Sequence, residues 1–163
     1  MSSTAVTNES LTIVTSSESE TRDVAKYFAE ELQPGDVVAL YGDLGAGKTV
    51  FVSAVAAALN VPAEAGVRSP SYTLMNLYEG GELPVAHLDL YRIDDVEELE
   101  ALGFRDLLDG VWLVFIEWPE RVPDLADDVT WRVVLEERDI EERGITLHAR
   151  RSQSLERLRK CLS

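Results

Sequence analysis

The chain has 163 residues and a formal net charge of −15 at pH 7, a length that suits one domain with a buried core. The negative charge argues against independent nucleic-acid binding, which needs a basic surface. One cysteine, Cys161, excludes an internal disulfide, and no apolar run approaches the ~20 residues that cross a bilayer. We therefore expect a cytoplasmic protein with no membrane partner.

Residues 1–10 are rich in serine and threonine and lack the basic and apolar regions of a secretory signal, so we predict a disordered leader. The remainder, 11–163, is predicted to form a single domain. Leu11–Val14 has the composition of a first strand. Ser17 and Glu20 then have the spacing of a capping box, which opens a helix. Apolar residues recur along this helix at four-residue intervals, at Val24, Phe28 and Leu32.

The next segment has the pattern of a strand, a loop and a helix. Val37–Tyr41 is a continuous apolar run with turn signals on both sides, which is typical of a fully buried strand. Lys48–Leu59 is apolar almost all round, as expected of a helix packed beside a sheet. With a glycine-rich loop between them, these elements predict the core unit of a nucleotide-binding α/β fold.

Further strands and helices follow in the second half of the chain. Residues 61–71 are predicted to be irregular, and Tyr72–Tyr78 and Val85–Tyr91 to be strands joined by a turn. Asp94 and Glu97 have the spacing of a cap for a short acidic helix. The last predicted elements are a buried strand at Val111–Trp118, paired strands at Trp131–Glu137 and Ile145–Ala149, and a helix at Leu155–Leu162. The predicted fold is a three-layer P-loop NTPase-like α/β sandwich, whose mostly parallel sheet has late antiparallel strands.

The glycine-rich loop matches the phosphate-binding pattern G-x-x-x-x-G-K-[ST]. Glycines let successive backbone N–H groups converge on phosphates at a helix N-terminus. In such loops the lysine reaches the β- and γ-phosphates of the nucleotide and the final hydroxyl is a Mg²⁺ ligand. The sequence therefore predicts a site for ATP and Mg²⁺ made by Gly42, Asp43, Leu44, Gly45, Ala46, Gly47, Lys48 and Thr49.

Two carboxylates are candidates for the metal partner. Asp89 and Glu117 each end an apolar run, at the carboxyl edge of the sheet where α/β proteins bind ligands. A buried carboxylate there needs a cation or a hydrogen-bond donor. Periodicity alone leaves open which of the two contacts Mg²⁺. His87 is interpreted as a hydrogen-bonded structural histidine.

Two other segments have weaker signals. Ser69–Thr73 supplies three hydroxyl groups beside a proline, which resembles the switch segments of other NTPases. The C-terminal segment is basic. Its charge is explained either by a docking surface for an acidic partner or by a solvent-exposed terminal helix, and we favour the second explanation. Its basic residues are Arg150, Arg151, Arg157, Arg159 and Lys160.

Taken together, the motifs resemble the TsaE (YjeE) family, ATPases required in bacteria for N6-threonylcarbamoyladenosine (t6A) in tRNA. The resemblance covers about Ser17 to Ala149. It rests on the phosphate loop and on three motifs that follow it in order: SPSYTL at Ser69–Leu74, HLDLYR at His87–Arg92 and IEWPE at Ile116–Glu120.

The resemblance implies an ATPase subunit that is required for the modification of tRNA adenosine 37 and acts within a complex, with TsaD and TsaB as partners and tRNA contacted indirectly. It assigns Mg²⁺ to Thr49 and Glu117 and a catalytic role to Asp89. It implies a nucleotide-sensing role for Ser69–Thr73, including Thr73. It further implies a functional aromatic at Trp118, an adenine contact near Glu18 and a loosely aligned contact near Glu141–Arg143.

Without the resemblance, the sequence is also compatible with two other functions, a small-molecule kinase and a nucleotide-gated interaction module. A small-molecule kinase needs a second substrate pocket and usually a basic lid, and the loops at 61–71 and 119–130 contain few basic residues. A GTPase is disfavoured because no N-K-x-D sequence occurs. The alternative from another class is a nucleotide-gated interaction module that does not require turnover.

Overall fold

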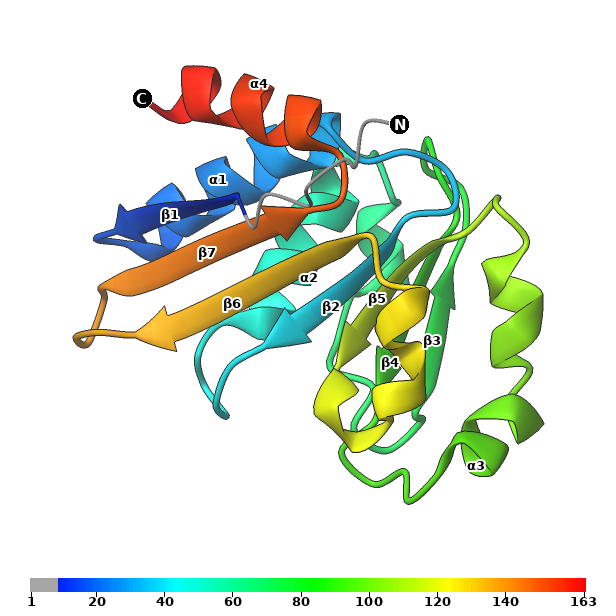
Figure 1. Cartoon of the computed structure of the whole chain (residues 1–163). Coiled ribbons are helices and arrows are strands. Elements are labelled where there is room, and N and C mark those ends of the chain that lie inside the picture. Colours follow the sequence, from blue (N-terminus) through cyan, green and yellow to red (C-terminus); the bar gives the residue numbers. More distant parts are fainter. Residues whose placement is uncertain (1–8) are drawn as a thin grey trace, which may run out of the picture.

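The computed structural model describes residues 9–163, so the part of the predicted leader at 1–8 lies outside the described residues. Seven strands form one sheet in the order β1-β7-β6-β2-β5-β4-β3 (Figure 1). Their bounds are β1 Ser10–Thr15, β2 Val37–Tyr41, β3 Met75–Tyr78, β4 Val85–Asp89, β5 Leu113–Glu117, β6 Trp131–Glu137 and β7 Arg143–Ala149.

The centre of the sheet is parallel and its margins are antiparallel. β2 pairs in parallel with β5 and β6, and β5 pairs in parallel with β4. β3 is antiparallel to β4, and β7 is antiparallel to β6 and to β1. Parallel strands are buried on both faces, which explains the uninterrupted apolar runs of β2 and β5. The predicted α/β class, with late antiparallel strands, is confirmed.

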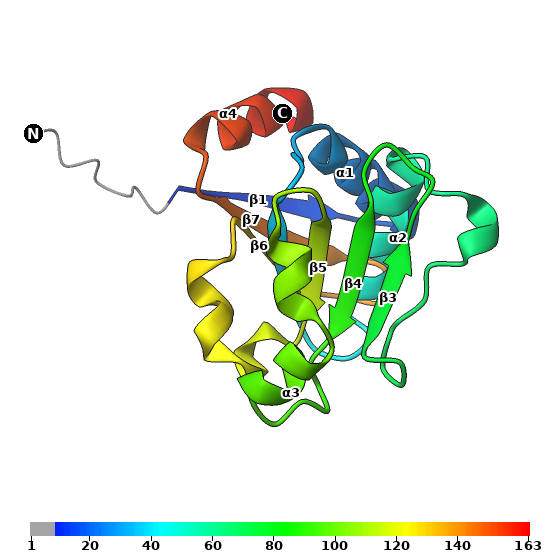
Figure 2. The same ribbon diagram turned by 90° about the vertical axis from the view of Figure 1, so that its right-hand side faces the viewer.

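Helices cover both faces of the sheet (Figures 1 and 2). One face holds α1 (Glu18–Glu30), α2 (Lys48–Ala58) and α4 (Ser152–Leu162). The other holds α3 (Val96–Ala101) and short 3₁₀ helices at Phe104–Leu108, Pro119–Arg121 and Pro123–Asp127. Side chains alternate along β2 between the two cores: Val38 and Leu40 face the first set, and Val37 and Ala39 face the second. Within residues 9–163, no helix is long and apolar enough to span a membrane.

The first helix begins as its sequence predicts. The Ser17 hydroxyl accepts a hydrogen bond from the Glu20 N–H at 3.1 Å. The Glu20 carboxylate accepts one from the Ser16 N–H at 2.7 Å, one residue before the cap residue whose N–H a standard capping box uses. Val24 and Phe28 are buried against the sheet. This cap fixes where Glu18 stands at the start of α1.

Several predicted boundaries differ from the structure. β4 ends at Asp89 instead of Tyr91, β7 begins at Arg143 instead of Ile145, and α4 begins at Ser152 instead of Leu155.

Three further boundaries differ for local reasons. β3 begins at Met75, because Pro70–Thr73 turns and Leu74 adopts a positive φ of 66°, which a strand cannot contain. The cap of α3 is Asp95 rather than Asp94: its carboxylate accepts from the Glu98 N–H at 2.9 Å. β5 is shorter than Val111–Trp118, since Trp118 has a φ of 58° and ends the strand.

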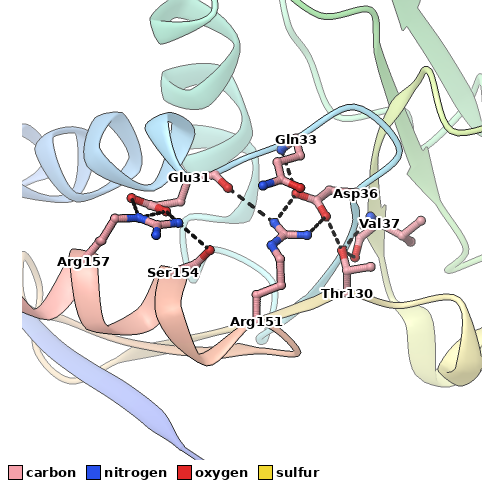
Figure 3. Close-up of polar contacts among 8 residues, drawn as sticks. All are labelled: Glu31, Gln33, Asp36, Val37, Thr130, Arg151, Ser154 and Arg157. Atoms are coloured by element: carbon pink, nitrogen blue, oxygen red, sulfur yellow. Dashed lines mark hydrogen bonds and ion pairs between the residues drawn. The ribbon is translucent and has the colours of Figure 1, made fainter.

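The basic C-terminal helix is docked and is not the solvated helix that we favoured. Leu155 and Leu158 of α4 are buried against α1 and the sheet. Arg151 donates from both terminal nitrogens to the Asp36 carboxylate at 2.8 Å (Figure 3). Arg157 pairs with Glu31 at 2.7 Å. These ion pairs explain two arginines that the sequence left without partners.

Candidate functional site

The glycine-rich loop connects the end of β2 to the first residue of α2. A Cβ atom on Gly42 would lie 2.6 Å from the backbone oxygen of Leu135, so only glycine fits there. Gly47 caps α2 with a φ of 102°, a conformation that glycine adopts without strain. The loop therefore brings backbone N–H groups to the N-terminus of a buried helix, an arrangement that attracts phosphate groups.

Lys48, the first residue of α2, is held against the loop. Its side chain is buried, and Nζ donates a hydrogen bond to the Gly42 carbonyl at 2.6 Å. Nζ also lies 4.1 Å from the centre of the Trp118 ring, a cation–π distance. The positive φ of Trp118 turns the chain at the end of β5. Lys48 is thus ordered, but by weak partners that an anion can replace.

A cavity of 350 Å³ opens beside this lysine, and we call it the phosphate-side cavity. It combines the loop with the ends of β4 and β5 and with the predicted switch segment. Its lining consists of Leu44, Gly45, Gly47, Lys48, Thr49, Val50, Ser69, Ser71, Asp89, Glu117 and Trp118. The structure therefore brings together, in one place, most of the residues that were predicted from separate parts of the sequence.

The two candidate carboxylates are direct neighbours in the sheet. Asp89 ends β4 and is paired in register with Glu117, which ends β5. Both are buried, at 5% and 3% exposure. Asp89 accepts hydrogen bonds from the Tyr91 N–H at 2.9 Å and from the Ser71 hydroxyl at 3.3 Å. Glu117 lies 2.8 Å from His87 Nε2, so the interpretation of His87 as a hydrogen-bonded residue is confirmed.

The hydroxyl and carboxylate groups of the phosphate-side cavity are suited to Mg²⁺ that is bound together with phosphate groups. Within residues 9–163, no three His, Cys, Asp or Glu side chains gather to hold a metal by themselves. Mg²⁺ is usually bound by one or two carboxylates together with substrate phosphates and water. The phosphate-side cavity offers a hydroxyl at Thr49 and two carboxylates for that purpose. The oxygen donors and their burial match a hard divalent cation.

A second cavity, of 340 Å³, shares Gly45, Gly47 and Val50 with the first, and we call it the hairpin-side cavity. It lies between the start of α1, the loop and the β6–β7 turn. Its remaining lining residues are Glu18, Thr21, Ala46, Ile140, Glu141 and Arg143. The first turn of α1, where the adenine contact is expected, and the β6–β7 turn, where the resemblance implies a further contact, thus face the same space. The loop therefore has one cavity on each flank.

Three predicted residues line neither cavity beside the loop. Gly42 contributes its backbone carbonyl to Lys48, and Asp43 and Thr73 have other contacts. The Thr73 hydroxyl donates to Asn76 at 2.8 Å, and Thr73 lines a separate 630 Å³ groove beside β3 instead of the phosphate-side cavity. Asp43 lines neither the phosphate-side nor the hairpin-side cavity; its backbone carbonyl accepts from the Ala46 N–H within the loop. Of the switch segment, Ser69 and Ser71 are the hydroxyl residues that reach the site.

The sequence analysis did not identify several residues that line the cavities or pack beside them. Thr21 follows Glu18 by one helical turn, and this spacing was a usable signal. Ile140 is 85% exposed within an acidic turn, where a large apolar residue is unexpected. Tyr91 packs on Trp118 with ring centres 5.1 Å apart, and Arg121 lies 5.6 Å from the Tyr91 ring. No sequence pattern indicated that stack, because the turn at Trp118 creates it.

A glycine-rich loop between a buried parallel strand and a helix, beside carboxylates at neighbouring strand ends, defines a P-loop NTPase-like protein of the α/β class. A family model described as "Threonylcarbamoyl adenosine biosynthesis protein TsaE" matches residues 15–145. The chain therefore belongs to the TsaE family.

Individual relatives agree with this family. The protein named tRNA threonylcarbamoyladenosine biosynthesis protein TsaE of Bacillus subtilis (strain 168) is 36% identical over 130 residues, 80% of each chain. Its namesake in Rickettsia prowazekii (strain Madrid E) is 36% identical over 132 residues, 81% of this chain and 90% of the relative. A crystal structure of Bacillus subtilis YdiB superimposes with a TM-score of 0.72 at 29% identity, over 93% of this chain and 95% of that one.

Proposed function

We propose that this chain is the Mg²⁺-dependent ATPase subunit of a cytoplasmic complex that forms t6A at adenosine 37 of tRNA, with TsaD and TsaB as its partners. The observation that carries the proposal is the phosphate-side cavity, where Lys48, Thr49, Asp89 and Glu117 meet. Family membership supports the pathway, since the relatives are named for threonylcarbamoyladenosine biosynthesis. With a net charge of −15, the chain is expected to contact tRNA only through its partners.

In the proposed mechanism, the loop and the polar side chains beside it have different roles. The loop N–H groups hold the phosphates, and Lys48 leaves the Gly42 carbonyl to contact phosphate oxygens. Thr49 and Glu117 would hold Mg²⁺, which supplies charge neutralisation when it is bound. Asp89, fixed by Ser71 and the Tyr91 N–H, is placed to orient the attacking water. Ser71 thereby links the switch segment to the reacting phosphate.

The two carboxylates are expected to differ in metal binding. Both Asp89 oxygens accept hydrogen bonds, whereas no hydrogen bond within residues 9–163 uses Glu117 Oε1. Glu117→Ala should therefore raise the Mg²⁺ concentration for half-maximal ATP binding by at least about tenfold, since loss even of a ligand's partner costs 10- to 100-fold. Asp89→Ala should raise it less. Mg²⁺ titrations of both variants with a fluorescent ATP analogue provide the measurement, and identical curves would reject the assignment.

The proposal is tested by reconstitution. Purified TsaB, TsaD and tRNA are combined with this protein or with its Lys48→Ala variant, and t6A is measured over many turnovers. Sustained synthesis with the wild type and stalling with the variant is the expected result. Sustained synthesis in the absence of this protein would overturn the proposed function.

A nucleotide-gated interaction module is the second candidate, because apolar surface adjoins the site. Leu44 lines the phosphate-side cavity and is 77% exposed. In this candidate function, Leu44 is the contact that the module would offer to a protein partner. A variant that binds ATP but does not hydrolyse it separates the two functions. Full t6A synthesis with such a variant would favour the module.

A further inference from the structure

His87 is a fully buried polar residue with no part in the mechanism above. It lies in β4, two residues before Asp89, and its exposure is 0%. Val85 of β4 and Phe115 of β5 belong to the core under α1 and α2. Because side chains alternate along a strand, His87 and Glu117 face that same side. The histidine therefore lies between the sheet and the helices, deeper than the site.

The imidazole makes one strong contact, and it is with a proposed metal ligand. His87 Nε2 lies 2.8 Å from Glu117 Oε2, diagonally across the strand pair, since the residue opposite His87 is Phe115. The other ring nitrogen, Nδ1, is buried and has no hydrogen-bond partner within residues 9–163. A proton on Nε2 is donated to the carboxylate. A proton on Nδ1 would be buried without an acceptor and would leave a nitrogen lone pair facing Oε2. The geometry therefore selects the tautomer with the proton on Nε2.

We propose that His87 is a positioning residue: its Nε2–H holds Glu117 by Oε2, so that Oε1 remains available to Mg²⁺ in the phosphate-side cavity. The inference rests on the proposed function, because it concerns the orientation of that metal ligand. Glu117 is 3% exposed, and His87 is the partner of its carboxylate among the described residues. Without the histidine, a buried carboxylate would lack a donor and would turn to find one. Residues that hydrogen-bond to a metal ligand, without contacting the metal themselves, commonly fix the orientation of that ligand.

Two substitutions separate the hydrogen bond from the bulk of the ring. In His87→Gln the amide nitrogen can occupy the place of Nε2 and still donate to Glu117. In His87→Asn the amide reaches only the place of Nδ1, so the donor to Glu117 is lost. We expect His87→Asn to raise the Mg²⁺ requirement for fluorescent-ATP binding by about 10- to 100-fold, and His87→Gln to stay within about threefold of the wild type. ATP binding with EDTA should be equal in all three proteins.

The outcomes are distinct. Wild-type Mg²⁺ dependence in both variants would overturn the positioning role, and so would equal loss in both, which would show that ring volume is what matters. A wild type that binds ATP without any effect of Mg²⁺ would overturn the metal site of the proposed function, and this inference with it.

A measurement on the unaltered protein guards against variants that fail to fold. Nitrogen-15 NMR of the metal-free wild type, labelled at histidine, should show His87 with its proton on Nε2. Glu117→Gln, whose amide can present either an oxygen or an N–H group to the ring, should shift the His87 Nε2 resonance, whereas His148 should not change. A His87 ring in the wild type with a proton on Nδ1 and none on Nε2 would overturn the proposal irrespective of any variant.

Discussion

Lys48→Ala should lower the affinity for ATP by about 100-fold or more. Among residues 9–163, Lys48 is the one lysine that lines the phosphate-side cavity, and a charge-assisted contact of about 3 kcal/mol corresponds to roughly 100-fold in Kd. In the described part of the chain, Nζ contacts the Gly42 carbonyl and the Trp118 ring, partners that phosphate oxygens easily replace. Isothermal titration calorimetry with Mg²⁺–ATP measures the effect.

Lys26→Ala is the matched control for this experiment. Lys26 lies on the exposed face of α1, outside both cavities that flank the loop. The Lys26→Ala substitution removes the same charge from the chain as Lys48→Ala. A difference in ATP affinity between the two variants therefore reports the position of the charge. An unchanged ATP affinity in Lys48→Ala, with the thermal unfolding midpoint preserved, would exclude the loop as the phosphate site.

Asp36→Asn should lower the free energy of unfolding by about 2–3 kcal/mol, the range for losing charge-assisted hydrogen bonds at a buried carboxylate whose ion-pair partner, Arg151, is 33% exposed. Asp36 is 2% exposed and accepts hydrogen bonds from Arg151, Thr130 and the Gln33 N–H, all between 2.8 and 2.9 Å (Figure 3). The contacts join the α1–β2 loop, the start of β6 and the start of α4. Urea unfolding followed by circular dichroism measures the loss, and Glu31→Gln, at the more exposed pair with Arg157, should have a much smaller effect.

The same carboxylate predicts a sensitivity to acid. Burial alone would raise the pKa of Asp36, but the hydrogen bonds from Arg151, Gln33 and Thr130 outweigh burial and lower it. A lowered pKa in the folded state means that the stabilisation is complete well above the unfolded value of about 3.9 and is lost as pH falls through the folded value. The difference in stability between wild type and Asp36→Asn should therefore be constant from neutral pH to about pH 5 and shrink below pH 4. A difference that grows on acidification would contradict this origin.

Local signals were sufficient for the first third of the fold. The Ser17 cap, the apolar run of β2 and the glycine loop each act within a few residues, and each prediction was confirmed. The boundary at β3 was wrong because Leu74 adopts a left-handed conformation that its residue type does not indicate. Asp94 and Asp95 are both suitable caps by type, and the sequence does not indicate that the helix uses Asp95.

Long-range contacts were beyond sequence reasoning, and they make up much of the site. Asp89 and Glu117 were correctly selected as strand-end carboxylates, but their pairing depends on the register of β4 against β5. The same register brings His87 to Glu117 across 30 positions of sequence. Asp36 and Arg151 are separated by 115 positions, and neither sequence neighbourhood indicates the other. Periodicity identifies the faces of elements, whereas these contacts require their order in the sheet.

The pairing of the first strand with the last has a consequence for synthesis on the ribosome. β1 is held by β7, from Ser10 opposite His148 to Thr15 opposite Arg143. The hairpin-side cavity likewise needs Glu18 from the start of the chain and Arg143 from near its end. A nascent chain can therefore form the glycine-rich loop early, yet β1 has no partner strand and the hairpin-side cavity has no far wall until residues 143–149 have left the exit tunnel.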